Sequence, residues 1–268
     1  VLVTEPAALA TVTQRRGRAG RTEPGICFRI WEQADEISRK PFPAPEMLEA
    51  DLAPLVLDLA LWGTTDPSTP SWLTPPPPGH YRSALQVLQS LEALDDQGRI
   101  TPHGREMALL PLHPRLGHMV LSARKHGLGP TAAALAAILG EPGRSMRGSS
   151  DLRDTLLIHP STLSRKDTLR ASMEQIARLA SISLQQPDPE AAGILTALAY
   201  PDRIARRQED GSYRLTSGRK AVWPGPSTLA GHEFLALAQL DGSADNARIW
   251  QAAPLSWQDL HKNFGVLM

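Results

Sequence analysis

The apolar positions between residues 51 and 112 repeat with the period of an α-helix. Asp51 is a favourable N-cap, Pro54 is tolerated in a first helical turn, and Gly63 ends the first apolar stripe. That stripe consists of Leu52, Leu55, Val56, Leu59 and Trp62. A second helix is predicted over 81–94, along which the apolar positions are Leu85, Leu88, Leu91 and Leu94.

A turn and a short strand are predicted after this second helix. The turn is Asp96-Gln97-Gly98, and the strand covers residues 99–101. Thr101 is then placed to cap a helix that extends through Met107. Helix, helix, small β-wing and helix is the order of elements in a winged helix, so we predict a winged-helix domain over 45–112.

Residues 113–200 are predicted to form a bundle of helices. Alanine and leucine fill 130–139, which is the composition of an inner helix that is apolar on all sides. Further helices are predicted over 115–126 and 164–184. Ser150 or Asp151 is the expected cap of one more helix, and Asp188-Pro189 is expected to open the last.

After Tyr200 the pattern changes from a helical period to alternation. Asp210-Gly211, between two alternating segments, is a strong hairpin signal. Five short strands are predicted, over 203–208, 212–216, 220–223, 234–240 and 247–252. Five short strands suit a small barrel, so we predict an OB-like β domain over 201–268, with a helix beginning near Ser256.

The first 44 residues predict a mixture of strand and helix. Val1–Val3 is predicted to be a short buried strand, and Pro6 opens an alanine-rich helix. Ile26–Trp31 alternates enough for a second strand, with Cys27 as a small core residue. Because the sequence starts inside a predicted strand, we expect it to be part of a longer protein.

Composition excludes several classes of protein. The 268 residues contain 28 Lys plus Arg and 28 Asp plus Glu, so the net charge is zero. A general polyanion binder is therefore not expected, although a local basic site remains compatible. The single cysteine argues against a disulfide framework and a cysteine-based zinc site and fits a reducing compartment. With no membrane-length apolar run and no signal peptide, we expect a cytoplasmic protein without a metal site.

The densest candidate chemistry lies in residues 14–21, Gln-Arg-Arg-Gly-Arg-Ala-Gly-Arg. If the preceding helix continues, Gln14, Arg18 and Arg21 fall at roughly 0°, 40° and −20° around its axis and share one face. Gly17 and Gly20 beside that face each cost about 1 kcal/mol relative to alanine, which indicates a close approach to the backbone. Guanidinium groups suit phosphate oxygens, but a solvated basic helix end is the alternative.

This segment resembles motif VI of superfamily 2 helicases, in the Q-R-x-G-R-x-G-R form of the DEAH-box enzymes. The resemblance implies that Arg18 and Arg21 are arginine fingers that reach the γ-phosphate of ATP, and that Gln14 helps to place the attacking water. A finger of this kind is worth about 10³–10⁵ in rate. In that family the motif belongs to the second RecA-like domain, which implies the end of such an α/β domain over 1–44.

The resemblance extends over nearly the whole chain. Residues 200–207, Tyr-Pro-Asp-Arg-Ile-Ala-Arg-Arg, resemble a segment of the bacterial HrpB helicases. Further HrpB-like segments are 24–27, 71–73, 137–142 and 211–218. The chain is thus identified as a member of the HrpB family, whose proteins are ATP-dependent and act on RNA. The implied fold class is multidomain and mostly α: a RecA-like end, a winged helix, a helical ratchet-like domain over 113–200, and the OB-like barrel.

The sequence contains neither a G-x-x-x-x-G-K-[ST] phosphate loop nor a D-E-A-H box. In the family both belong to the first RecA-like domain, which this chain would need as a partner. The resemblance therefore implies that ATP and Mg²⁺ bind the longer parent protein. We expect this chain alone to bind no cofactor and to hydrolyse no ATP, and we expect the family's C-terminal extension to continue beyond Met268.

A basic hairpin is the second candidate site. Residues 203–220 contain six basic side chains against Glu209 and Asp210. The residues expected to bind single-stranded nucleic acid, and RNA in particular by the resemblance, are Arg203, Arg206, Arg207, Arg214, Lys220 and Tyr213, the last by stacking on a base. The alternative is ordinary, because about half of the side chains on alternating strands simply face water.

A function of another class competes with the helicase assignment. The chain could be a non-enzymatic adaptor that binds nucleic acid through its winged helix and OB-like barrel. The adaptor hypothesis predicts tight, salt-dependent binding of single strands that is indifferent to Arg18 and Arg21. The helicase hypothesis predicts weak binding by the chain alone, because half of the channel would be supplied by another domain.

Overall fold

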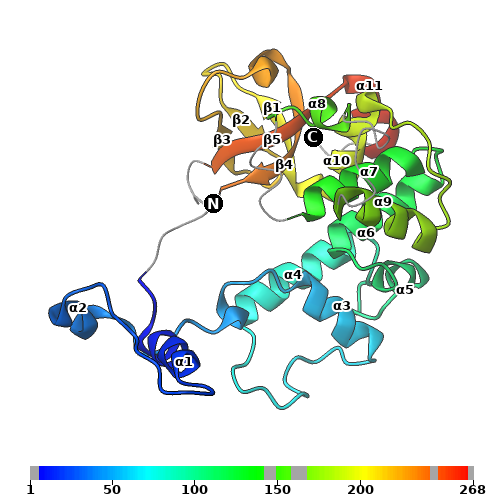
Figure 1. The fold of residues 1–268 in the computed structure, drawn as a ribbon. Helices are drawn as coiled ribbons and strands as arrows, with labels where there is room; N and C mark the ends of the chain where they lie inside the picture. The colour runs from blue at the N-terminus through cyan, green and yellow to red at the C-terminus, as the bar shows by residue number, and fades with distance from the viewer. Residues whose placement is uncertain (1–5, 142–148, 158–167, 242–246, 265–268) are drawn as a thin grey trace. The chain divides into compact units, whose positions relative to one another are not determined.

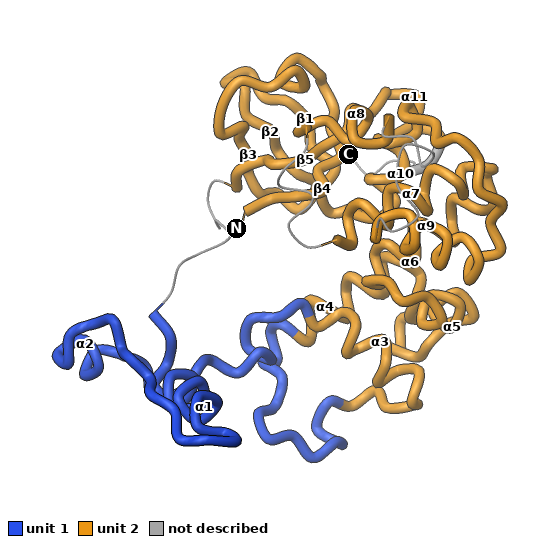
Figure 2. The backbone as a smooth tube through the Cα atoms, viewed as in Figure 1, with its two compact units in different colours: residues 1–51, 67–80 blue, residues 52–66, 81–268 orange. Residues whose placement is uncertain are grey.

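The computed structural model describes residues 6–141, 149–157, 168–241 and 247–264, and the chain divides into two compact units (Figures 1 and 2). Unit 1 comprises residues 1–51 and 67–80, and unit 2 comprises residues 52–66 and 81–268. The strand predicted at Val1–Val3 lies outside the described residues.

Unit 1 contains the helices α1 (Leu9–Ala19) and α2 (Gln33–Ser38) and the 3-10 turn η1 (Glu46–Leu48). Two backbone hydrogen bonds of 3.0 Å join the start of α1 to residues 40–41. Arg39 also donates to the carbonyl of Ala7 at 3.1 Å, and its guanidinium lies 4.1 Å from the ring centroid of Trp31. Polar contacts around the first turn of α1, together with the burial of Ala8 and Val12, therefore hold this part of unit 1 together.

The strand predicted over Ile26–Trp31 is wrong, because this segment has no regular secondary structure. Its alternating apolar side chains Ile26, Phe28 and Ile30 are 81%, 84% and 96% exposed. A strand needs a hydrogen-bonded neighbour, and no described strand pairs with this segment. For the same reason Cys27 is exposed and is not the small core residue that was predicted.

The predicted winged-helix region contains α3 (Ala53–Leu61), α4 (Pro78–Ser90) and α5 (Pro102–Ala108). The side chain of Thr101 accepts from the backbone N–H of Gly104 at 3.0 Å, which confirms the predicted cap, and Leu94 and Ile100 form the small β-bridge. The Asp51 cap is wrong: the N-cap of α3 is Leu52, with no side-chain hydrogen bond. A proline in the first turn of α3 removes one N–H that a cap would satisfy.

The described part of unit 2 continues with the helices α6 (Pro114–Arg124), α7 (Gly129–Gly140), α8 (Leu152–Leu156), α9 (Thr168–Leu179) and α10 (Ala192–Ala199), the last preceded by η3 (Pro189–Ala191). Helix α7 is buried along nearly its whole length and packs against α6 and α9, as its composition predicted. Side chains of Asp151 and Asp188 cap α8 and η3 as expected. Helix α9 ends before the predicted residue 184, because Ser181 takes a left-handed φ of 55°.

The predicted five strands close into a barrel. They are β1 (Ile204–Arg207), β2 (Tyr213–Leu215), β3 (Lys220–Val222), β4 (Phe234–Leu240) and β5 (Ala247–Leu255), with η4 (Pro201–Arg203) and η5 (Thr228–Gly231) in the connections and α11 (Trp257–Phe264) after β5. The strand order is β1-β2-β3-β5-β4, and β3 and β5 run parallel. Gly211 has a φ of 79° in the β1–β2 hairpin, as the turn signal predicted.

Helix α10 packs against β4 and β5 (Figure 1). The approach is close at Gly193, where an added Cβ would lie 1.9 Å from the carbonyl oxygen of Pro254. Helices α10 and α11 thereby cover one part of the barrel's outer face with an apolar cluster that includes Ile204, Phe234 and Leu260. The outer face of β1, β2 and β3 continues beyond this cluster and carries the basic side chains.

Candidate functional sites

The arginine-rich segment lies on α1 and in the turn after it. Gln14, Arg18 and Arg21 are all exposed, and none of the three has an ion pair or a side-chain hydrogen bond with a described residue. Val12, which lies about 200° around the axis from Gln14, is the buried residue of the helix. Gln14 and Arg18 therefore share the face of α1 that points away from its packed side.

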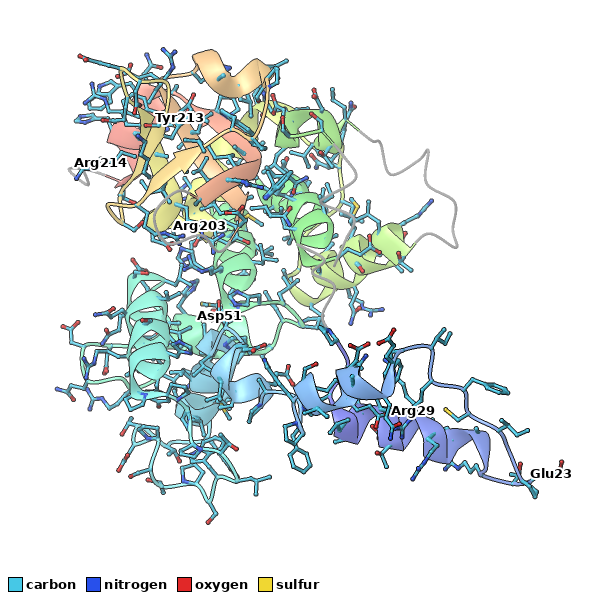
Figure 3. All side chains as sticks on the ribbon, turned by 90° about the vertical axis from the view of Figure 1, so that its left-hand side faces the viewer. Glu23, Arg29, Asp51, Arg203, Tyr213 and Arg214 are labelled. Atoms are coloured by element: carbon cyan, nitrogen blue, oxygen red, sulfur yellow. The ribbon has the colours of Figure 1, made fainter. Side chains whose placement is uncertain are left out.

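Arg21 is not placed by the helix, contrary to the expectation of one common face. Helix α1 ends at Ala19, and Gly20 has a φ of −112° and a ψ of 32°. Gly25 returns so close to the helix end that an added Cβ would lie 1.9 Å from the carbonyl oxygen of Ala19. Only glycine fits that approach, so the chain can pass close to the end of α1 directly after the turn that carries Arg21 (Figure 3, where Glu23 marks the turn).

Three basic side chains line up across the outer face of the barrel. Arg206 on β1 pairs with Arg214 on β2, and Arg214 pairs with Lys220 on β3. Paired residues on neighbouring antiparallel strands project to the same face, so these three exposed side chains form one line across the strands. We call Arg206, Arg214 and Lys220 the cationic row.

Two depressions with volumes of about 480 and 590 Å³ lie along the cationic row. Both are lined by Arg214 and Gly218; Arg206 lines the first and Lys220 the second. Because Gly218 has no side chain, the backbone of the β2–β3 turn leaves this surface uncovered beside Arg214. A ligand that extends along the face can therefore reach all three cations.

Acidic neighbours offset the charge of the row only at its ends. Lys220 Nζ lies 2.7 Å from the carboxylate of Asp210, and Arg206 lies 3.3 Å from that of Glu233. The hydrogen bond from Lys220, followed by those from Ser212, holds the pKa of the Asp210 carboxyl well below its usual range. Arg214, in the middle, has no ion pair with a described residue, and Figure 3 shows it at the outer edge of the barrel.

The stacking role predicted for Tyr213 is wrong. Its side chain is 0% exposed in the barrel core, and its hydroxyl donates to the carbonyl oxygens of Leu229 and His232 at 3.1 and 2.9 Å. Burial raises the pKa of this phenol. A base cannot reach a ring enclosed in this way, so Tyr213 stabilises the barrel instead.

Arg203 and Arg207 do not join the cationic row. Arg203 donates to the carbonyl oxygen of Ala238 at 2.9 Å and lies 4.5 Å from the ring centroid of Tyr200, so its guanidinium is already engaged. Arg207 is exposed, but it pairs with Tyr213 and leaves β1 on the face opposite to Arg206. The structure thus brings together three of the six residues that were predicted to bind nucleic acid.

One exposed aromatic residue near the row was missed by the sequence reasoning. Trp257, the first residue of α11, is 59% exposed and packs on Phe234. The signal in the sequence was weak: Ser256 and Asp259 form a helix-capping pattern that places the intervening tryptophan in a first turn. The pattern does not reveal which surface the turn faces, because that depends on how the barrel closes.

Other chemistry is sparse in the described ranges. No three His, Cys, Asp or Glu side chains there gather closely enough to hold a metal ion. None of the described helices combines the length and the apolarity that a membrane crossing requires. His103 and His118 lie 2.9 Å apart, and burial lowers the pKa of both, that of His118 to about 4.

Comparisons with known proteins point to helicases. The family "Helicase associated domain (HA2), winged-helix" matches residues 84–112. The ATP-dependent RNA helicase HrpB of Escherichia coli is 37% identical over 253 residues, which cover 92% of this chain and 30% of that protein. The pre-mRNA-splicing factor ATP-dependent RNA helicase prp22 of Schizosaccharomyces pombe is 37% identical over 142 residues, or 53% of this chain and 12% of that protein.

Solved structures agree with these sequence relatives. The crystal structure of the E. coli DExH-box NTPase HrpB matches with a TM-score of 0.76 and 35% identity, over 98% of this chain and 32% of that one. A second crystal structure, of the E. coli DEAH/RHA helicase HrpB, also matches with a TM-score of 0.76, at 33% identity. The chain therefore spans about a third of the length of HrpB. In sequence and in structure, this chain is therefore similar to one segment of the E. coli helicase HrpB.

Proposed function

We propose that this chain supplies the arginine-finger side of the nucleotide site, and part of the nucleic-acid path, of an ATP-dependent RNA helicase. The observation that carries the proposal is the exposed Gln14 and Arg18 pair on α1, which has no partner among the described residues, within a motif that resembles motif VI. A guanidinium that is not neutralised by a carboxylate remains available for a phosphate. Gly17 beside it has no other atom within 4 Å of an added Cβ, which leaves room for a ligand.

The finer division of the chain belongs to the same proposal. Residues 1–44 end a RecA-like domain, 45–112 form a winged helix, 113–200 a ratchet-like domain and 201–268 an OB-like barrel. The exposed, alternating apolar side chains of Ile26, Phe28 and Ile30 support the first of these. They would be buried, and the segment stabilised as a strand, if a neighbouring strand and helices of a RecA-like domain covered them. The five-strand barrel with parallel β3 and β5 supports the last.

ATP hydrolysis would need a partner domain. The 268 residues contain no phosphate loop and no DEAH box, so Gln14, Arg18 and Arg21 would act on ATP and Mg²⁺ held by another RecA-like domain. A finger lowers the barrier only where a nucleotide is already positioned. Phosphate release by this chain alone should therefore stay at background.

A chimera tests the finger assignment. The corresponding segment of E. coli HrpB is replaced by this chain, and RNA-stimulated phosphate release is measured. We expect Arg18→Ala and Arg21→Ala each to lower the rate by about 10³–10⁵-fold. Arg16→Ala is the matched control, because it removes an arginine at the position that the motif leaves open, and it should retain activity.

The outcome separates the two classes of function. If the chimera hydrolyses ATP and both finger variants remain as active as Arg16→Ala, the assignment of Arg18 and Arg21 is refuted. The adaptor function would be supported if the 268-residue chain alone bound single-stranded RNA tightly and Arg18→Ala left that affinity unchanged.

The cationic row is the proposed contact with RNA. Three cations that follow one face are expected to release counterions from a single strand, so the plot of log K against log salt should have a slope of roughly −2, or about 0.7 per phosphate contact. Arg214→Ala should reduce the slope by about 0.7. Arg207→Ala, which removes an equal charge from the opposite face of the same hairpin, should change it much less.

A further inference from the structure

The cationic row continues into an aromatic ring. Arg206 pairs with Arg214 on one side and with Phe234 of β4 on the other, so the line of side chains crosses from charged to aromatic on one face. The guanidinium carbon of Arg206 lies 5.8 Å from the ring centroid of Phe234, within the range of a cation–π contact. Phe234 itself is only 4% exposed, so it cannot be the ring that a ligand meets.

Trp257 covers the same Phe234 ring and remains exposed. The two ring centroids are 5.8 Å apart, with 35° between their planes, and the indole is 59% exposed. One turn further along α11, the ring of His261 stacks on Trp257 with a centroid distance of 6.4 Å and an angle of 20°. The exposed indole therefore lies against the Phe234 ring that ends the line of side chains, and the imidazole of His261 lies against the indole.

The local structure holds Trp257 in place. Ser256 Oγ accepts from the backbone N–H of Asp259 at 3.1 Å and donates to its carboxylate at 2.6 Å, which fixes the first turn of α11. Leu260, three residues after Trp257, is 4% exposed in the cluster that contains Phe234. A large exposed indole is thus presented by a capped and anchored helix end, where little conformational entropy is lost on binding a ring.

We infer that Trp257 is a stacking platform for a base of a single-stranded nucleic acid whose phosphates follow the cationic row. The inference rests on the proposed function of that row. The positive charges of the row favour binding of a polyanion. An exposed indole beside the row favours a polyanion that carries planar rings, because the rings can stack on it. Arg206 and Trp257 both contact Phe234, so a phosphate and a neighbouring base can be engaged together. Stacking of this kind is tolerant of sequence.

The test combines a protein variant with an altered ligand. The 268-residue chain and its Trp257→Ala variant are titrated with labelled oligouridylate of about 12 nucleotides, within the site size of small barrels, and with an abasic strand of equal length. Trp257→Ala should weaken binding of oligouridylate by about 5- to 150-fold, the value of one stacked base. The abasic strand should bind the native chain weakly, and the substitution should weaken it no further.

Three further variants separate the loss of stacking from misfolding, from the loss of an unrelated indole and from the loss of charge. Trp257→Phe should retain most of the affinity and keeps the test valid if Trp257→Ala is poorly folded. Trp62→Ala removes an indole that is 81% exposed after α3 and should change nothing. Arg214→Ala should lower the salt slope by about 0.7, whereas Trp257→Ala should leave the slope unchanged.

Failure of this inference and failure of the row are distinguishable. If Arg214→Ala lowers the slope but Trp257→Ala binds oligouridylate as tightly as the native chain, the stacking platform is refuted and the row stands. If neither substitution matters, the row is refuted as well. If a polyglutamate peptide displaces the RNA, and Trp257→Ala weakens binding of the peptide as much as it weakens binding of the RNA, the surface binds an acidic protein segment and the inference is overturned.

Discussion

The joint between the helical bundle and the barrel gives the sharpest stability prediction. Arg115 of α6 is 5% exposed and binds the carboxylate of Asp202 with two nitrogens, at 2.5 and 3.1 Å. The same guanidinium lies 5.4 Å from the ring centroid of Tyr200 and 3.4 Å from the carbonyl oxygen of Ala199. Substituting Asp202→Ala leaves a buried positive charge with only these weaker contacts.

The expected cost follows from the burial of the two partners. Breaking a buried ion pair by removing one partner costs about 3–5 kcal/mol, but Asp202 is 44% exposed and water screens part of the attraction, so we expect about 2–4 kcal/mol. That loss corresponds to a fall in Tm of roughly 4–16 °C for a unit of this size. Urea and thermal denaturation followed by circular dichroism measure both quantities.

Two controls identify the cause. Glu174→Ala breaks the surface pair between Arg170 and Glu174 and should cost only about 0.3–0.5 kcal/mol. Combining Arg115→Met with Asp202→Ala removes both charges from the joint and should recover most of the loss. If Asp202→Ala costs no more than Glu174→Ala, the buried guanidinium does not depend on its carboxylate and the reasoning is refuted.

Two other substitutions test packing and titration in unit 2. Gly193→Ala should destabilise by about 1–3 kcal/mol, because its Cβ would lie 1.9 Å from a β5 carbonyl oxygen, whereas Gly225→Ala meets no atom within 4 Å and should be nearly neutral; chemical denaturation compares them. Burial lowers the folded-state pKa of His103 and that of His118, the latter to about 4, so the unfolded chain binds more protons below pH 6.5. Stability should be complete above pH 6.5 and fall as pH drops from 6.5 towards 4. The urea midpoint at a series of pH values should show this fall, and His118→Gln should flatten it; a midpoint that is independent of pH over this range contradicts the assignment.

Short-range signals predicted most of the elements in unit 2. The caps at Thr101 and Asp151 and the left-handed Gly211 are confirmed, since each depends on a few neighbouring backbone groups. The composition of 130–139 likewise predicted a buried helix, because a helix that is apolar on every side has to be covered on every side. These features could be read from the sequence without knowledge of the tertiary structure.

Predictions that needed a partner in space were less successful. Alternation at Ile26–Trp31 indicated a strand, but strand formation depends on a neighbour that the local pattern does not reveal. Alternation also places Tyr213 and Arg214 on opposite faces without saying which face is inside, so Tyr213 was assigned to the surface. The cationic row and the position of Trp257 depend on strand register and barrel closure, which bring together residues about 50 positions apart in the sequence.

The contacts of Arg115 also bear on the nucleic-acid site. Arg115 of α6 contacts Asp202 and Tyr200, which lie just before β1. Arg206 of the cationic row lies on that strand. The helical bundle therefore contacts the segment that leads into β1, while the β1–β2 turn sets which residue of β1 faces Arg214. A rearrangement of the bundle that kept the Arg115–Asp202 pair would have to carry the start of β1 with it. The ion pair thus links the packing of the helices to the position of the proposed RNA contact. A barrel joined to the bundle only by a flexible linker would lack this link.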